Sequence, residues 1–321
     1  MPFARPTLLF VLAIAACRVE DGRRLAADSV AAVRKANTIA NAPKPAGTAA
    51  GFREPASARY DPALDVVFVS NVDGAPGAKD GNGFISRVRP DGTVDSLRFI
   101  AGGRGGAKLD APKGLAITGD TLWAADIDAV RAFDARTGAP LATVDLKPLG
   151  AAFLSGIAVG PDGALYVTDA GPGGRSDAAH GNRIFRIGAG RRASVAVHSD
   201  SLGAPSGITW DARGNRFIIV QWGGARILAW RPGDAQPRTI GFGAKQMDGV
   251  QLLADGRLIV SSRAEHAIMI RFAAEEYTVK GFSAPGDFGV DTRRQRLAIP
   301  IADKNTVEFW DIPPFTPPAT P

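Results

Sequence analysis

The sequence predicts an all-β protein, a six-bladed β-propeller of four-stranded blades that is closed by an N-terminal strand. Short runs of β-branched and aromatic residues alternate along the chain with turn residues, as they do in strands and hairpins. The 38 glycines and 23 prolines are spread between these runs. A similar segment recurs six times at intervals of 38 to 57 residues, which is typical of propeller blades.

The first 17 residues have the pattern of a bacterial lipoprotein signal peptide. Arg5 precedes an apolar run from Thr7 to Ala16, which as a helix would be about 15 Å long, roughly half of a bilayer core. Ile14-Ala15-Ala16-Cys17 resembles a lipobox, in which the cysteine becomes the lipidated first residue. The alternative is a plain secretory signal with an incidental cysteine. We expect an exported protein, lipid-anchored in the cell envelope and facing the periplasm or the exterior.

The remaining chain divides into a tether, a propeller and a tail. Residues 18–47 are rich in alanine and polar residues, which predicts a flexible tether. The propeller is expected over residues 48–312, and the proline-rich residues 313–321 form an extended tail. The net charge of +6 is scattered singly through the repeats, and this argues against nucleic-acid binding. We expect a monomer whose contact with the membrane is its lipid anchor.

Each repeat supplies its strands in the order inner to outer. The expected inner strands are Ser57–Asp61, Gly114–Ile117, Gly156–Val159, Gly207–Asp211, Gly249–Leu252 and Asp287–Asp291. The expected second strands are Val66–Ser70, Leu122–Asp126, Leu165–Asp169, Phe217–Gln221, Leu258–Ser262 and Leu297–Ile301. The expected third strands are Phe84–Arg89, Val130–Asp134, Arg183–Ile187, Arg226–Trp230, Ala267–Phe272 and Thr306–Asp311. The expected fourth strands are Ser96–Ile100, Leu141–Leu146, Ser194–Ser199, Pro237–Gly241 and Tyr277–Phe282.

The sixth repeat lacks a fourth strand at its C-terminal end. Residues Thr48–Arg53, just before the first repeat, can supply it and leave no exposed sheet edge. A helical solenoid is excluded because no repeat has an apolar period of 3.6 residues. The ring is therefore expected to close with a strand from the N-terminus.

One mouth of the propeller channel is the expected functional site, because inner strands begin there and loops after second strands end there. The residues just before the inner strands are Ala56, Lys113, Ser155, Ser206, Asp248 and Gly286 with Asp287. The residues at or after the ends of second strands include Asn71, Asp126, Asp169, Trp222, Ser262 and Asp303. The histidines His180 and His266 lie on connecting loops, where solvated histidines are common. No Gly-x-Ser-x-Gly, Walker A or His-Glu-x-x-His motif is present.

Several segments resemble the gluconolactonase / luciferin-regenerating enzyme / senescence marker protein superfamily, and in particular an exported bacterial branch of it. The segments are Arg59–Pro62, Asp80–Val88, Ala111–Gly114, Tyr166–Asp169, Asp287–Asp291 and Arg296–Pro300. The resemblance implies a six-bladed propeller, similar to NHL repeats, that holds one divalent metal, Ca²⁺ or Zn²⁺, at the channel mouth. It implies ligands of Glu before the first inner strand, Asn before middle inner strands and Asp before the fifth.

The ligand positions of that family fall on Ala56, Ser155, Ser206 and Asp248 here, so that only Asp248 keeps a ligand side chain. Glu54 lies on the same strand face as Ala56, about 7 Å away, and together with Asp287 it is the next candidate ligand. A hard divalent cation prefers six to eight oxygen ligands. The resemblance therefore implies a weak metal site at most.

Two functions follow from these residues. In the first, a lactonase-type hydrolase uses Asp248 as metal ligand or general base, and Lys113, Asp126 and Asp169 orient the substrate. Asp126 and Asp169 can equally satisfy turn N–H groups, and Lys113 can be an anion contact or a rim charge. In the second, a binding propeller recognises a small molecule or a protein at the same mouth. Its contact face is expected to comprise Ser155, Ser206, Trp222, His180, His266 and Asn71.

Replacement of Cys17 by alanine is expected to release the protein from the membrane. If Cys17 carries the anchor, the wild type sediments with membranes and Cys17→Ala stays in the soluble fraction. Equal release of both proteins during membrane fractionation would contradict lipidation at this residue.

Overall fold

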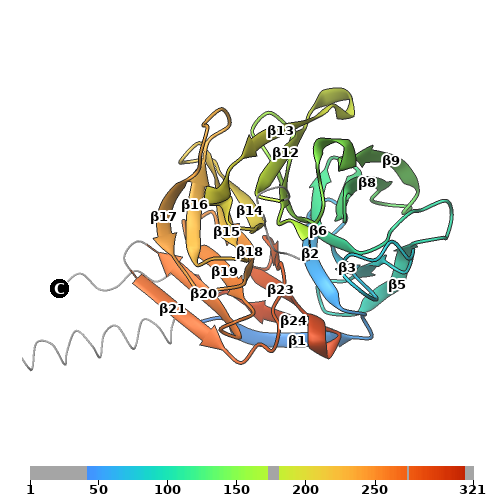
Figure 1. Ribbon diagram of the computed structural model, residues 1–321. Helices are drawn as coiled ribbons and strands as arrows, with labels where there is room; N and C mark the ends of the chain where they lie inside the picture. The colour runs from blue at the N-terminus through green and yellow to red at the C-terminus, as the bar shows by residue number, and fades with distance from the viewer. Residues whose placement is uncertain (1–41, 173–180, 273–274, 315–321) are drawn as a thin grey trace, which may run out of the picture. The chain divides into compact units, whose positions relative to one another are not determined.

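Six four-stranded antiparallel sheets stand in a ring around a central axis, and each sheet is one blade of the expected propeller (Figure 1). The computed structural model describes residues 42–172, 181–272 and 275–314, and Pro43–Ile312 form one compact unit. Cys17, His180, most of the expected tether and residues 315–321 of the expected tail lie outside the described residues. None of the helical segments in the described ranges is long and apolar enough to cross a bilayer.

The strands run from the axis outward in chain order, except in the sixth blade. Blade one contains β2 (Pro55–Asp61), β3 (Val66–Asn71), β4 (Phe84–Val88) and β5 (Val94–Ala101). Blade two contains β6 (Pro112–Thr118), β7 (Thr121–Asp126), β8 (Ala129–Asp134) and β9 (Pro140–Asp145). Blade three contains β10 (Leu154–Val159), β11 (Leu165–Asp169), β12 (Arg183–Ile187) and β13 (Ala193–His198).

The second half of the ring repeats this order. Blade four contains β14 (Pro205–Asp211), β15 (Arg216–Gln221), β16 (Arg226–Trp230) and β17 (Arg238–Phe242). Blade five contains β18 (Met247–Leu252), β19 (Leu258–Ser262), β20 (Ala267–Phe272) and β21 (Glu275–Lys280). Blade six contains β22 (Gly289–Asp291), β23 (Arg296–Ile301), β24 (Thr306–Asp311) and β1 (Lys44–Ala50). Short 3₁₀ turns lie at Lys147–Leu149, Ala189–Arg191, Asp200–Leu202 and Ala302–Lys304.

The N-terminal strand closes the ring as expected, but it begins earlier than the sequence suggested. Strand β1 pairs antiparallel with β24 along its whole length, and Figure 1 shows it at the outer edge of blade six. Residues 44–47, expected in the tether, belong to this strand, and residues 51–53 lie beyond its end. All its residues except Ala49 are exposed, so no apolar pattern marks it. Pro45 is tolerated because an outermost strand has one free edge.

A β-bulge interrupts each inner strand of blades one to five near its first residue. The register with the second strand shifts between Pro55 and Ser57, Pro112 and Leu115, Leu154 and Ile157, Pro205 and Ile208, and Met247 and Val250. A bulge re-aims side chains and leaves backbone groups outside the ladder. The bulges coincide with the positions expected to line the channel mouth.

Neighbouring inner strands touch at these bulges, and the contact requires glycine. A Cβ atom built on Gly114 would lie 2.4 Å from the carbonyl oxygen of Ser155 in the next blade. A Cβ atom on Gly156 would lie 2.4 Å from the carbonyl oxygen of Ser206. Real Cβ atoms do not approach so closely, so any side chain here would push the blades apart.

In blades one, three and five, a hydroxyl on the second strand joins its own inner strand to the next blade. Thr168 Oγ1 accepts the Gly156 N–H at 2.8 Å and donates to the Ser206 carbonyl at 2.5 Å. Ser70 Oγ likewise bridges the Ser57 N–H and the Lys113 carbonyl, and Ser261 Oγ bridges the Gly249 N–H and the Gly286 carbonyl. Each hydroxyl thus satisfies a backbone donor freed by the bulge and links two blades.

The seam between blades six and one is built differently. Asp287 pairs with blade one through its backbone: its N–H donates to the Ala56 carbonyl at 3.0 Å, and its carbonyl accepts the Ala58 N–H at 2.8 Å. Strand β22 therefore begins only at Gly289, two residues later than expected. This pairing fixes the Asp287 side chain beside blade one.

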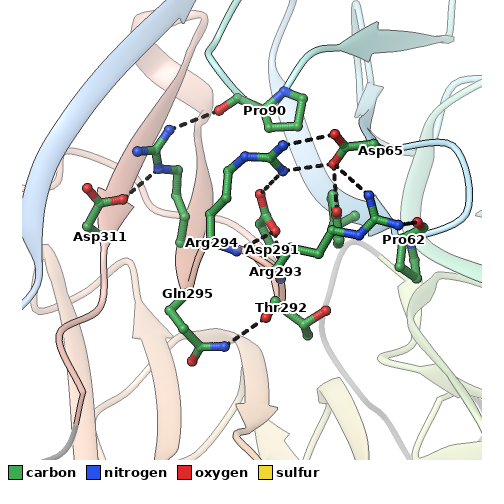
Figure 2. A network of polar contacts seen from close by, with 11 residues as sticks. Pro62, Asp65, Pro90, Asp291, Thr292, Arg293, Arg294, Gln295 and Asp311 are labelled. Carbon is green, nitrogen blue, oxygen red and sulfur yellow. Dashed lines mark hydrogen bonds and ion pairs between the residues drawn. The ribbon is translucent and has the colours of Figure 1, made fainter.

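A charged network on the turns of blades six and one holds the same seam (Figure 2). Arg294 binds both carboxylate oxygens of Asp65, at 2.7 and 2.9 Å, and also contacts Asp291 at 2.9 Å. Hydrogen bonds from Arg294 and Tyr60 hold the pKa of Asp65 well below its usual range. Two further bonds cross the seam, from Arg293 Nη2 to the Pro62 carbonyl at 2.6 Å and from Arg296 Nη1 to the Pro90 carbonyl at 3.0 Å.

Replacement of Arg294 by glutamine is expected to lower the melting temperature more than replacement of Arg186. Both side chains are 40% exposed, but Arg186 pairs with Asp162 inside blade three, whereas Arg294 joins two blades and balances Asp291, whose side chain is 3% exposed. Thermal melts of Arg294→Gln and Arg186→Gln measure the difference, which is expected to shrink in high salt. Equal losses would show that the network does not secure the closing seam.

Candidate functional site

In blades one to five, the bulges place the side chain of the second residue of each inner strand at one mouth of the channel. A cavity of about 250 Å³ lies there and takes lining residues from all six blades. Its charged lining residues are Glu54, Lys113, Asp248, Arg263 and Asp287. Its apolar walls include Val72, Phe153, Ala170, Trp222 and Ala302. Ala56, Ser155 and Ser206, each the second residue of an inner strand, also line it.

Asp248 is bound by an arginine. Its Oδ2 lies 3.1 Å from Nη2 and 3.2 Å from Nε of Arg263, which follows the second strand of the same blade. The Arg263 guanidinium lies over the ring of Trp222, 5.4 Å from its centroid. Burial raises the pKa of Asp248, and the positive charges of Arg263 and Lys113 oppose that rise. The carboxylate expected to hold a metal is thus already neutralised by a guanidinium.

Asp287 is the second buried carboxylate of the cavity. Its Oδ2 accepts a hydrogen bond from Ser57 Oγ at 2.7 Å and lies 3.2 Å from Nη2 of Arg59. Arg59 also donates through Nε to the Leu115 carbonyl at 2.8 Å, which links blade one to blade two. Burial, reinforced by the nearby charge of Asp248, raises the pKa of Asp287 to about 6, although Arg59 and Ser57 act in the opposite direction.

Lys113 reaches into the cavity from blade two. Its Nζ donates to the Pro76 carbonyl at 2.9 Å and to the Ala111 carbonyl at 3.4 Å. It also lies 4.0 Å from the centroid of the Phe153 ring, a cation–π arrangement. Burial lowers the pKa of Lys113 to about 8, although Asp126 and Asp248 act to raise it.

Asp126 and Asp169 do not line the cavity. Asp126 is fully buried at the end of β7 and accepts the N–H groups of Asp110 and Ala111, and Arg131 pairs with it at 3.1 Å. Asp169, at the end of β11, accepts three backbone N–H groups, from Ala152, Phe153 and Gly171. Burial raises the pKa of each carboxyl, and these backbone donors oppose the rise. The geometry gives both residues the turn-stabilising role.

Three other expected site residues also make structural contacts. Asn71 is buried and binds the Arg53 N–H, the Val69 carbonyl and Ser86 Oγ. Ser206 lines the cavity, but its hydroxyl donates to the Met247 carbonyl at 2.5 Å. His266 lies on an exposed turn outside the cavity lining, and its ring contacts the Ser283 carbonyl. Trp222, Ser155 and Glu54 do lie in the cavity lining, as expected.

The three carboxylates that line the cavity already have partners. Within the described ranges, no three His, Cys, Asp or Glu residues gather closely enough to hold an ion. Glu54, the third carboxylate of the lining, accepts the Gly74 N–H through Oε2 at 3.0 Å. A metal would have to displace Arg263 from Asp248, and Arg59 from Asp287, beside the positive charge of Lys113.

Arg263, Arg59 and Phe153 were not expected from the sequence. Arg263 could have been predicted as a site residue, because it directly follows the second strand of its blade, as Trp222 does.

Comparisons with known proteins place the fold. No family model matches the chain, and no curated protein matches it. Among solved structures it is similar to a virginiamycin B lyase from Staphylococcus aureus, at 16% identity and a TM-score of 0.53, over 80% of this chain and 94% of that one. It is also similar to a streptogramin B lyase, at 14% identity and a TM-score of 0.56, over 81% and 94% of the two chains.

A third similar structure is described as a gluconolactonase, with 13% identity and a TM-score of 0.61, over 84% of this chain and 93% of that one. The fold implied by the sequence resemblance is therefore confirmed: the chain has the propeller fold that these three structures share. At these identities a shared fold leaves the chemistry to the residues of each site.

Relative to the variant Asp287→Asn, the wild type is expected to lose stability as the pH rises from 4 to 7. The pKa of Asp287 is about 6 in the folded protein, compared with 3.8 for a free aspartate. The protonated carboxyl therefore stabilises the fold below pH 4, and this contribution is lost as the carboxyl ionises near pH 6. The relative loss is roughly 2–3 kcal/mol. Urea unfolding across this range measures it.

The exposed β9 carboxylate Asp145 provides the matched control. Asp145→Asn is expected to follow the wild type in the same titration. Parallel stability profiles of the wild type and Asp287→Asn would contradict a raised pKa at Asp287.

Proposed function

We propose that this propeller binds a small organic molecule at the channel mouth and holds it without a divalent metal. The observation that carries the proposal is the pairing of the cavity carboxylates: Asp248 with Arg263, and Asp287 with Arg59 and Ser57. Carboxylates that already neutralise partly buried guanidinium groups are poor ligands for a further cation, because the arginines would be left without their counter-charges. The proposal includes the exported, lipid-anchored location expected from the N-terminus.

The dimensions of the cavity favour a small molecule over a protein partner. About 250 Å³ is slightly below the range of ~300–1,000 Å³ that is common for small-molecule sites. The walls combine two aromatic rings, Phe153 and Trp222, with a few polar groups directed at one volume. This composition is typical of pockets that fix the orientation of a small ligand.

The alternative is a metal-dependent hydrolase of the lactonase type. It is supported by the likeness of the fold and by the presence of Asp248 and Asp287 in one cavity. In that case Asp248 would have to leave Arg263 in order to bind a metal or to act as a general base. The two functions therefore differ in whether the ion pair between Asp248 and Arg263 opens.

Millimolar Ca²⁺ or Zn²⁺ is expected to leave the melting temperature of the wild type unchanged, because stabilisation follows RT ln(1 + [L]/Kd) and vanishes when Kd is large. The variant Ala56→Glu with Ser155→Asn and Arg263→Gln restores two ligand side chains and frees Asp248. We expect a Ca²⁺-dependent rise of several degrees in this variant. Ala56→Glu with Ser155→Asn alone is the control, and it is expected to respond less because Arg263 remains.

Hydrolysis of a small lactone, followed by pH-stat with and without added metal, tests the alternative. We expect no metal-dependent hydrolysis in the wild type. A large Ca²⁺ shift in the wild type, together with lactone hydrolysis that is lost in Asp248→Asn, would overturn the binding proposal in favour of the hydrolase.

A further inference from the structure

The two cations of the channel-mouth cavity differ in their partners. Arg263 has the carboxylate of Asp248 in contact. Lys113 takes part in no ion pair among the described residues, and its contacts are the carbonyls of Pro76 and Ala111 and the ring of Phe153. Carbonyl oxygens and an aromatic face supply hydrogen bonds and partial charge, but they carry no net negative charge. Lys113 is thus the cavity cation whose charge is not neutralised by contact.

An ammonium in this position costs free energy. Burial favours the neutral amine and lowers the pKa of Lys113 to about 8. A negative charge brought into the cavity would offset this cost, because an opposite charge nearby favours the protonated form. In the described ranges, the cavity therefore lacks a negative charge in contact with Lys113.

The Ser155 hydroxyl is the next feature of the cavity, in the blade that follows that of Lys113. Ser155 occupies in blade three the position that Lys113 occupies in blade two, and the two inner strands touch there, since a Cβ on Gly114 would lie 2.4 Å from the Ser155 carbonyl. Both side chains line the cavity. Within the described part of the chain, Ser155 Oγ makes no hydrogen bond, in contrast to Ser206 Oγ, which donates to Met247. Lys113 and Ser155 thus present two donors to the same cavity.

We propose that the ligand of this cavity is a small monocarboxylic acid, whose carboxylate binds Lys113 Nζ and Ser155 Oγ and whose apolar body lies between Phe153 and Trp222. This inference rests on the proposed small-molecule binding and names the class of ligand. A single negative charge fits best, because Asp248, Asp287 and Glu54 share the same cavity and would repel a dianion. The cavity volume limits the body to about the size of one ring.

The affinity for a carboxylate then depends on pH through Lys113. The charged groups that face it are Asp126 behind it on β7, Asp248 on β18, and Glu54, Arg263 and Asp287 in the cavity lining. Above about pH 8 the amine loses its proton and binding weakens by about tenfold per pH unit.

Binding of benzoate and phenylacetate to the purified protein, measured by calorimetry, tests the proposal against their neutral amides. At pH 7 we expect both carboxylates to bind at least tenfold more tightly than benzamide and phenylacetamide. Lys113→Met is expected to abolish this preference, whereas Lys147→Met, at an exposed lysine away from the cavity, is expected to leave it intact. Ser155→Ala is expected to weaken carboxylate binding by a few-fold to tenfold.

Two further readouts separate a ligand contact from a structural role. Lys113→Met removes a partly buried charge and is expected to melt above the wild type while it loses carboxylate binding. Lys113→Arg keeps a charge at high pH, so its residual affinity for benzoate is expected to stay constant between pH 7 and 9.5, where that of the wild type falls.

The outcomes distinguish the inference from the proposed function. Amides that bind as well as the carboxylates, or a Lys113→Met variant that keeps the preference, would overturn the carboxylate inference and leave small-molecule binding in place. Failure of both carboxylates and amides to bind the wild type would overturn the inference and count against the binding proposal as well.

Discussion

The close approach of neighbouring inner strands at the axis is the constraint on which the rest of the molecule depends. At each of five inner strands a bulge brings the backbone of one blade against the next, and glycine is required where a Cβ would lie 2.4 Å from a carbonyl oxygen. The bulge frees backbone donors, and hydroxyls on second strands recover three of them while binding the next blade. The same bulge directs the preceding side chain toward the axis. Ring closure and site construction therefore have one physical origin.

The seam between blades six and one departs from this pattern. As a result, paired charges gather on one side of the channel mouth. Asp287 stands where the other blades have glycine or Ser57, and its backbone pairs with blade one. Its carboxylate is held between Ser57 and Arg59, while Asp248 on the adjacent blade is held by Arg263. On this side of the cavity charges neutralise one another. On the opposite side Lys113 and Ser155 have no such partners among the described residues. That side is therefore the one we propose to bind the carboxylate of a ligand.

The architecture was predictable because its signals are local. Strands such as Leu165–Asp169 and Thr306–Asp311 agree with the expected bounds to the residue, since turn residues mark both ends. The start of β1 was wrong by four residues because an exposed outermost strand carries no apolar period. The mouth positions Lys113, Ser155 and Asp248 followed from the repeat. The arginine partners of the two aspartates were not predicted. Arg59 pairs with Asp287 across a blade seam, and such pairing leaves no trace in a single sequence, whereas Arg263 pairs with Asp248 inside blade five.

A high-resolution crystal structure grown with both millimolar CaCl₂ and benzoate tests most directly whether the mouth takes an organic anion or a metal. We predict a carboxylate on Lys113 and Ser155, an intact ion pair between Asp248 and Arg263, and no calcium ion in the cavity. A calcium ion on Asp248 and Asp287, with Arg263 displaced from its carboxylate, would contradict this.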